Sequence, residues 1–163
     1  VAQASYAGYT EPDPRVDLSG EDVRRKLLIL ARAAGLSLHP HDVRVASLVP
    51  DALPRADAAA VDGLLPSLDA PLRERYRQAE QDGARLRFVG RFEVDAAGRI
   101  LADVGLRALP ANHALCSGSG TDNRVAISSD RYREQPLVVQ GPGAGAEVTA
   151  AALLDDVIQI SHP

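Results

Sequence analysis

The hydrophobic pattern predicts a helix near the N-terminal end of the chain. Between Ser19 and Ala34, apolar residues recur every three or four positions, which is typical of one helix face. Ser19 followed by Asp22 forms a capping-box-like pattern, and Gly35 follows the last periodic residue. The preceding segment, 8–18, contains prolines and carboxylates and predicts a structured loop. The expected apolar stripe consists of Val23, Leu27, Leu30 and Ala34, with Ile29 and Ala33 near its edge.

Two opposite charges fall inside this apolar arc. On a helical wheel, Asp22 and Lys26 lie one turn apart, between Leu30 and Ile29. We therefore expect both side chains to point toward the protein interior or a cleft. One interpretation is an ordinary ion pair, worth about 0.3–0.5 kcal/mol when exposed, with Asp22 also capping the helix. The other interpretation is that the pair takes part in chemistry.

From the residues alone, the ordinary ion pair is the preferred interpretation, and the lysine count is the observation that points to chemistry. The chain has 18 lysine and arginine residues, and Lys26 is the only lysine. A position that needed only positive charge would tolerate arginine in a chain with this bias. An ammonium can shift its pKa and transfer a proton, whereas a guanidinium stays charged. We infer that position 26 requires a primary amine.

The remaining pattern alternates strands and helices. The loop 95–98 between two β-rich segments predicts a hairpin and therefore antiparallel pairing. We predict an α/β mixed (α+β) fold, with a largely antiparallel sheet of about four or five strands and helices packed on it. The expected strands are 41–49, 85–94, 99–106, 124–128 and 137–140, and the expected helices are 56–65, 71–83 and 147–160.

Composition limits the function classes. A chain of 163 residues is one domain long, and its net charge of −4 is spread out, which does not indicate a nucleic-acid surface. The single cysteine excludes an internal disulfide and fits a reducing compartment, so we expect a cytoplasmic protein. No apolar stretch reaches membrane-spanning length, and we expect no membrane partner. The start at Val1 rather than Met suggests a fragment of a longer protein.

Three other features of the sequence are candidates for chemistry. His39 and His41 flank a proline, but no third ligand lies nearby, and we expect no metal site. Cys116 and Ser119 lack the context of a nucleophile. The acids between Glu11 and Asp22 are either a solvated acidic loop or a negative pocket suited to a substrate ammonium.

A glycine-rich turn at 141–145 connects an expected strand to the last helix. Its backbone N–H groups and the helix N-terminus are suited to face a phosphate. The spacing, however, is neither that of a dinucleotide fingerprint nor that of a phosphate-binding loop with lysine. Taken alone, the segment is best interpreted as a plain strand-to-helix turn.

Two distant segments carry a family resemblance. The first includes Gly8-Tyr9-Thr10-Glu11-Pro12-Asp13-Pro14-Arg15, Asp17-Leu18-Ser19-Gly20, Asp22-Val23 and Arg25-Lys26, and the second is Gln135-Pro136-Leu137-Val138-Val139-Gln140-Gly141-Pro142-Gly143-Ala144-Gly145-Ala146-Glu147-Val148-Thr149-Ala150-Ala151. The first closely resembles the substrate-site signature of homoserine dehydrogenases, and the second resembles the C-terminal glycine turn and helix of that family. The two segments occur in the family's order, and the resemblance covers essentially the whole chain.

The resemblance implies reduction of aspartate semialdehyde to homoserine with NADP or NAD, on the route to threonine and methionine. It implies that Lys26 is the acid/base group and that Glu11 holds the substrate ammonium. Asp17 and Asp22 would order the polar end of the site, with Thr10 also binding substrate. By the same resemblance, Gly143 and Gly145 would lie beside the nicotinamide nucleotide.

The resemblance also implies a missing part. Family members place a nucleotide-binding domain before this region, sometimes after an aspartate kinase. We expect residues 1–140 to form the catalytic and substrate-binding portion, and residues 141–163 to pack on the absent domain. The chain alone should be inactive and form a homodimer. The rival interpretations are a non-catalytic amino-acid-binding module and a dimerisation module.

Overall fold

The computed structural model describes residues 3, 6, 13–49, 61, 63–117, 122–143 and 145–162. The chain divides into two compact units. The first comprises residues 1 and 10–111, and the second comprises residues 2–9 and 112–163.

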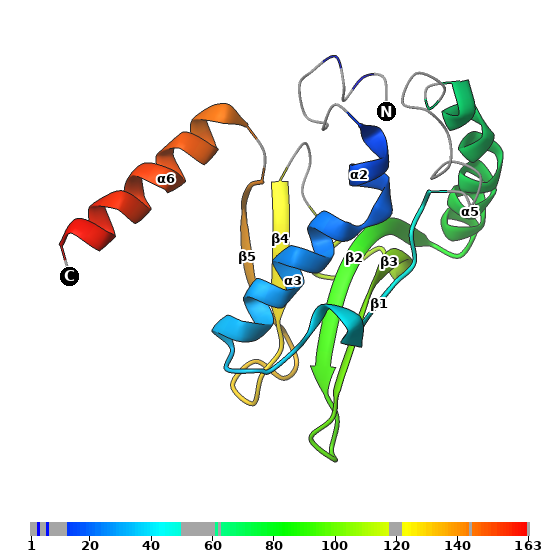
Figure 1. The fold of residues 1–163 in the computed structure, drawn as a ribbon. Coiled ribbons are helices and arrows are strands. Elements are labelled where there is room, and N and C mark those ends of the chain that lie inside the picture. Colours follow the sequence, from blue (N-terminus) through cyan, green and yellow to red (C-terminus); the bar gives the residue numbers. More distant parts are fainter. Residues whose placement is uncertain are drawn as a thin grey trace. The chain divides into compact units, whose positions relative to one another are not determined.

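The first unit contains a three-stranded sheet in the order β1-β3-β2. The long strands β2 and β3 pair antiparallel along their whole length, and β1 pairs parallel with the middle of β3. Helix α3 packs on this sheet against β2 and β3 (Figure 1). The elements of this unit are α2 (Pro14–Ser19), α3 (Glu21–Ala33), the 3₁₀ turn η1 (Pro40–Asp42), β1 (Val43–Val45), the 3₁₀ turn η3 (Leu65–Leu68), α5 (Asp69–Gln81), β2 (Ala84–Val94) and β3 (Ile100–Pro110).

The second unit contains an antiparallel pair and a helix. Strand β4 (Asp122–Ile127) pairs with β5 (Leu137–Pro142), and α6 (Ala146–Ser161) follows. The predicted α/β mixed fold with mostly antiparallel pairing is therefore confirmed. The five described strands are divided between sheets of three and two strands.

The described core lies between α3 and the three-stranded sheet. Ala31 is fully buried, and Val104 of β3 is only 1% exposed. Burying aliphatic side chains is the main favourable contribution to folding, at roughly 25 cal/mol per Å². This packing anchors α3 and fixes which of its faces remains open. The cluster is formed by Leu27, Leu28, Ala31, Leu38, Val43 and Val104, with Val23, Val45, Phe88 and Phe92 among the partly buried residues against it.

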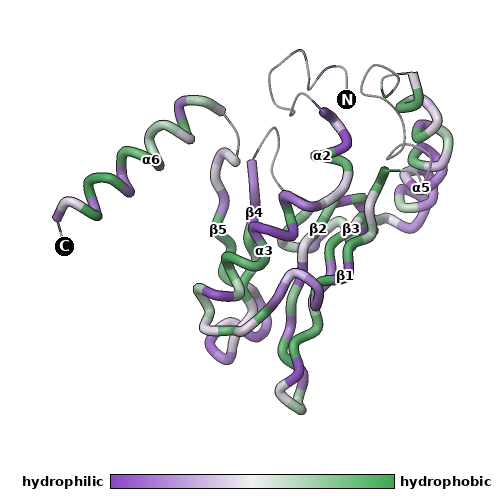
Figure 2. The backbone as a smooth tube through the Cα atoms, viewed as in Figure 1, coloured by the Kyte–Doolittle hydropathy of each residue, from purple (hydrophilic) through white to green (hydrophobic). Residues whose placement is uncertain are grey.

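Helix α6 is different, because each of its described side chains is exposed. Figure 2 shows hydrophobic residues recurring along this helix. Leu153, Val157 and Ile160 are 62%, 62% and 80% exposed. Among the described residues, no helix is long and apolar enough to cross a bilayer.

The hairpin between β2 and β3 forms where the sequence predicted it. The carboxylate of Asp95 accepts hydrogen bonds from the backbone N–H groups of Ala97 and Arg99, both at 2.9 Å. It also accepts one from Nε of Arg99 at 2.8 Å. These bonds, from the Arg99 backbone first, lower the pKa of the Asp95 carboxyl below its ordinary value.

Several predicted boundaries differ from the structure. The strand expected over 41–49 is reduced to Val43–Val45, because Pro40 starts a 3₁₀ turn that contains His41. The helix expected from Pro71 begins at Asp69, directly after η3. Strand β5 extends through Gly141 and Pro142, which were expected in the turn. Most of the helix expected over 56–65 lies outside the described residues.

Candidate active site

The segment before Lys26 begins with a short helix. The Asp13 side chain caps α2 by accepting a hydrogen bond from the backbone N–H of Arg15 at 2.9 Å, and Pro14 takes the first helical position. The Arg15 guanidinium also donates to both oxygens of Asp13, from Nε at 2.9 and 3.0 Å and from Nη2 at 2.7 Å. This pairing lowers the pKa of Asp13 and raises that of Arg15. The prediction of a loop throughout 8–18 is therefore wrong from Pro14 onward.

Gly20 joins α2 to α3 and brings both helices close to the sheet. It is buried, with φ +81°, a conformation that favours glycine. A Cβ at this position would lie 3.0 Å from Cζ of Phe88 and 3.2 Å from Cγ1 of Val45. The N-cap of α3 is thus Gly20, and the prediction of Ser19 is wrong by one residue. Ser19 instead ends α2, where its hydroxyl donates to the carbonyl of Val16 at 2.7 Å.

The buried face of α3 is rotated from the predicted stripe. Leu27, Leu28 and Ala31 are buried, whereas Leu30 is 39% and Ile29 is 63% exposed. The rotation follows from the sheet contacts: a Cβ on Gly90 of β2 would lie 2.9 Å from Cγ1 of Val23. Glycine at position 90 therefore lets the helix approach the sheet on its Val23 side.

Asp22 and Lys26 lie on the opposite, open side of α3. Their ion pair joins Nζ of Lys26 to Oδ2 of Asp22 at 2.9 Å, and the side chains are 50% and 52% exposed. The two charges do not point into the interior, because they lie with Ile29 and Leu30 on the exposed face of the helix. The alternative that they face a cleft stays a prediction. The structure places an accessible ammonium beside a carboxylate, on a helix whose opposite face packs on the three-stranded sheet.

The other predicted substrate residues divide into two groups. Asp17 lies on α2, in the same unit as Asp22 and Lys26, and is exposed. Thr10 and Glu11 lie outside the described residues. The structure therefore brings Asp22 and Lys26 into direct contact, places Asp17 on the adjoining helix, and leaves the roles of Thr10 and Glu11 as predictions.

The predicted cofactor residues belong to the second unit. Gly143 directly follows β5, and a Cβ there would overlap the side-chain amide of Asn123. Gly145 is the N-cap of α6, with φ +128°, and its carbonyl accepts from the N–H and hydroxyl of Thr149, both at 3.1 Å. Both positions thus require glycine, one for space and one for backbone conformation.

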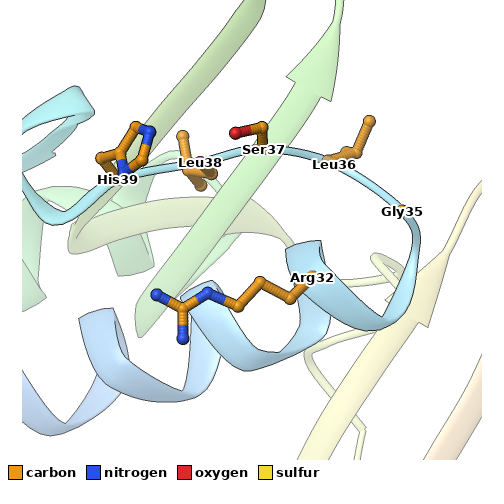
Figure 3. A pocket seen from close by; sticks show the side chains of 6 residues that line it. All are labelled: Arg32, Gly35, Leu36, Ser37, Leu38 and His39. Atoms are coloured by element: carbon orange, nitrogen blue, oxygen red, sulfur yellow. The ribbon is translucent and has the colours of Figure 1, made fainter.

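Two further features do not join the candidate site. The rings of His39 and His41 are stacked with centroids 5.4 Å apart, and the described part of the chain holds no group of three or more potential metal ligands. A pocket of about 380 Å³ lies at the C-terminal end of α3, whereas Lys26 lies in its first half. Figure 3 shows this pocket between the Arg32 side chain and the segment 35–39.

Sequence reasoning did not assign the structural roles of Asp13, Arg15 and Gly20. The order Asp-Pro-Arg is itself a helix-start signal, because aspartate is a good N-cap and proline is favoured next. No local signal indicates that Gly20 lies against Phe88, since that contact joins residues far apart in the sequence.

Residues 1–158 match the family model for homoserine dehydrogenase. The chain belongs to the homoserine dehydrogenase family. It is 48% identical over 162 residues to a chloroplastic bifunctional aspartokinase/homoserine dehydrogenase of Zea mays, covering 99% of this chain and 17% of the relative. It is 43% identical over 163 residues to the homoserine dehydrogenase of Paracoccidioides brasiliensis, covering 98% of this chain and 43% of that enzyme.

The fold is shared with solved structures. A Candida auris protein of unknown function matches with a TM-score of 0.83 and 40% identity, over 98% of this chain and 44% of that protein. The chain thus spans less than half the length of these homoserine dehydrogenase relatives.

Proposed function

We propose that this chain supplies the substrate-binding and catalytic part of an enzyme that reduces aspartate semialdehyde to homoserine with NADPH or NADH. The observation that carries the proposal is the Asp22–Lys26 pair on the open face of α3. This pair contains the only lysine of the chain. Membership of the homoserine dehydrogenase family, through a match to residues 1–158, supports the reaction.

Lys26 has the chemistry that aldehyde reduction requires. A reduced nicotinamide, when bound, supplies the hydride. As negative charge develops on the aldehyde oxygen, the Lys26 ammonium stabilises that charge and donates the proton that makes the hydroxyl. Asp22, at 2.9 Å, holds the ammonium in one place. In homoserine oxidation, the same amine accepts the proton.

The carboxylates that precede Lys26 in the sequence are suited to bind the amino-acid end of the substrate. We propose that Glu11 binds the substrate ammonium, and that Thr10 and Asp17 complete the polar end. Asp17 lies on α2, whose Asp13 cap and Gly20 junction fix it to the same framework as Lys26. One rigid framework would therefore set the distance between the ammonium-binding end and the proton donor.

The glycine turn fits a nucleotide. Gly143 and Gly145 carry no side chains of their own, and Gly145 is the N-cap of α6, a helix of 16 residues. An exposed backbone at a helix N-terminus can accept a negatively charged or dipolar ligand. We propose that Gly143 and Gly145 form one wall of the nicotinamide nucleotide site.

We further propose that residues 141–163 pack on a nucleotide-binding domain supplied by the parent protein, with residues 1–140 as the catalytic portion. The exposed apolar side chains of α6 support this, because such a face tends to bind a partner. A homodimer in the cytoplasm remains our expectation, although the maize relative is named chloroplastic. The 163 residues alone should fold without appreciable NADPH affinity, and calorimetric titration with light scattering measures both properties.

The decisive test is an assay of the longer parent protein. Mixing it with NADPH and aspartate semialdehyde should give a loss of nicotinamide absorbance that depends on both substrates. An amino-acid-binding module would bind the aldehyde without oxidising NADPH, and a dimerisation module would do neither. Either result would overturn the proposed reaction.

A further inference from the structure

Strand β5 ends at Pro142, directly before Gly143. Its last residue, Pro142, pairs in register with Asp122 of β4. Proline has no backbone N–H, so Pro142 donates no backbone hydrogen bond at the end of the strand. Within the described residues, the β4–β5 ladder ends at this pair, and Gly143 begins the connection to α6.

A side chain from β4 occupies the space beside Gly143. Asn123 lies opposite Gly141 in the β4–β5 register, one residue before the end of the ladder. Its carboxamide fills the volume that a Cβ at position 143 would take, with nitrogen, carbon and oxygen all in contact range. By contrast, a Cβ on Gly141 would meet nothing within 4 Å. The close approach is thus specific to position 143.

We propose that Asn123 is a positioning residue for the nucleotide wall, acting through Gly143. Its amide packs against the glycine backbone where the ladder stops, and so sets the path of the chain from Pro142 toward the N-terminus of α6. A short, planar carboxamide suits this role because it is flat and carries both donors and an acceptor beside an exposed backbone. The functional part of this inference rests on the proposed dehydrogenase reaction, and the steric part does not.

The steric part is tested by a double-mutant cycle on the melting temperature. Gly143→Ala should lower it by roughly 3 °C, the scale of a modest destabilisation in a chain of this size. Asn123→Ala should change it little, and the double variant should recover most of the loss, because the new methyl group fills the vacated space. Gly141→Ala is the matched control and should leave the melting temperature unchanged. Additive effects, or no loss in Gly143→Ala, would overturn the contact.

The functional part is tested in the full-length parent by steady-state kinetics. Asn123→Ala and Gly143→Ala should each raise KM for NADPH by about tenfold and leave KM for aspartate semialdehyde within twofold, while the double variant regains most of the loss. A purely structural role would move both constants together and would refute the proposal. So would an Asn123→Ala enzyme with unchanged KM for NADPH. If the wild-type parent oxidises no NADPH, the proposed reaction fails, yet the melting-temperature cycle still decides the contact.

Discussion

The lysine end and the glycine end of this chain are built differently. Lys26 lies on a helix whose back face is buried, with Leu27 and Leu28 only 5% and 6% exposed. The glycine turn leads into α6, in which each described side chain is exposed. The first region fixes its functional groups with its own core. The second consists of a glycine turn and an apolar helix, and none of the described side chains of that helix is buried in a core.

This difference indicates how the work of an active site is divided. A proton donor must be held in a fixed position, because small displacements of a reacting group reduce the rate strongly. Its support is accordingly internal to the first unit. A cofactor-binding wall needs an accessible backbone and a second protein surface that covers the cofactor. We propose that the nucleotide-binding domain of the parent protein supplies this second surface. The comparison can be tested at each end.

The largest effect should come from Lys26. In the full-length parent, Lys26→Arg keeps the positive charge but removes the proposed proton donor, and turnover should fall about 10²–10⁴-fold. Arg25→Lys, one position away on the same helix, is the matched control and should retain near wild-type turnover. Steady-state rates measure both variants. A Lys26→Arg enzyme within a few-fold of wild type would remove the assigned role.

The unequal support of the two ends predicts unequal stability effects. Leu28→Ala creates a cavity beneath α3 and should lower the free energy of unfolding by about 2–5 kcal/mol. Leu153→Ala makes the same chemical change on α6, where the side chain is 62% exposed, and should cost less than about 0.5 kcal/mol. Urea denaturation of the 163-residue chain measures both. Equal losses would show that α6 is buried in solution and that the contrast between the two ends is wrong.

The sequence predicted the elements at the lysine end better than their orientation. Periodicity located α3 within two residues at each end, yet the buried face was misplaced toward Leu30. The reason is that Ile29, Leu30 and Ala33 are apolar but exposed. Apolar residues therefore cover most of the helical wheel, and periodicity alone does not identify the buried face. Only the long-range contacts of Gly20 and Gly90 with the sheet decide which side is buried.

At the glycine end, the sequence predicted which glycines form the turn but not which side chains contact them. The motif marked Gly143 and Gly145, but nothing in a local pattern indicates that Asn123 lies against Gly143. That contact depends on the β4–β5 register, which joins residues about twenty positions apart. For Thr10 and Glu11, family resemblance remains the source of the assignment.

A smaller effect is expected from Glu11, and it should be confined to one substrate. Glu11→Gln removes the charge proposed to bind the substrate ammonium, and a lost charge-assisted hydrogen bond costs about 1.5–3 kcal/mol. KM for aspartate semialdehyde should therefore rise by roughly 10–100-fold, with KM for NADPH unchanged. Steady-state titration of each substrate measures this. If KM stays constant and the melting temperature falls, Glu11 is structural.

The smallest expected effect is on the acid dependence of the melting temperature. The Arg15 guanidinium lowers the pKa of Asp13 below its ordinary value of 3.8, so protonation favours the unfolded chain. The stabilisation from this carboxylate is complete above that ordinary pKa and is lost as pH falls through the lower folded value. Asn still caps a helix but does not titrate. Asp13→Asn should therefore flatten the acid dependence of the melting temperature below about pH 4.

Asp155→Asn is the corresponding control at the glycine end. Within the described residues, no hydrogen bond or ion pair to the Asp155 carboxylate is present, so Asp155→Asn removes no such contact. Melting curves between about pH 2.5 and 6 compare the two variants with the wild type. An unchanged acid limb in Asp13→Asn would mean that the Asp13–Arg15 pair does not stabilise the start of α2. In that case the packing of Gly20 against the sheet would hold the lysine end in place without the capped helix before it.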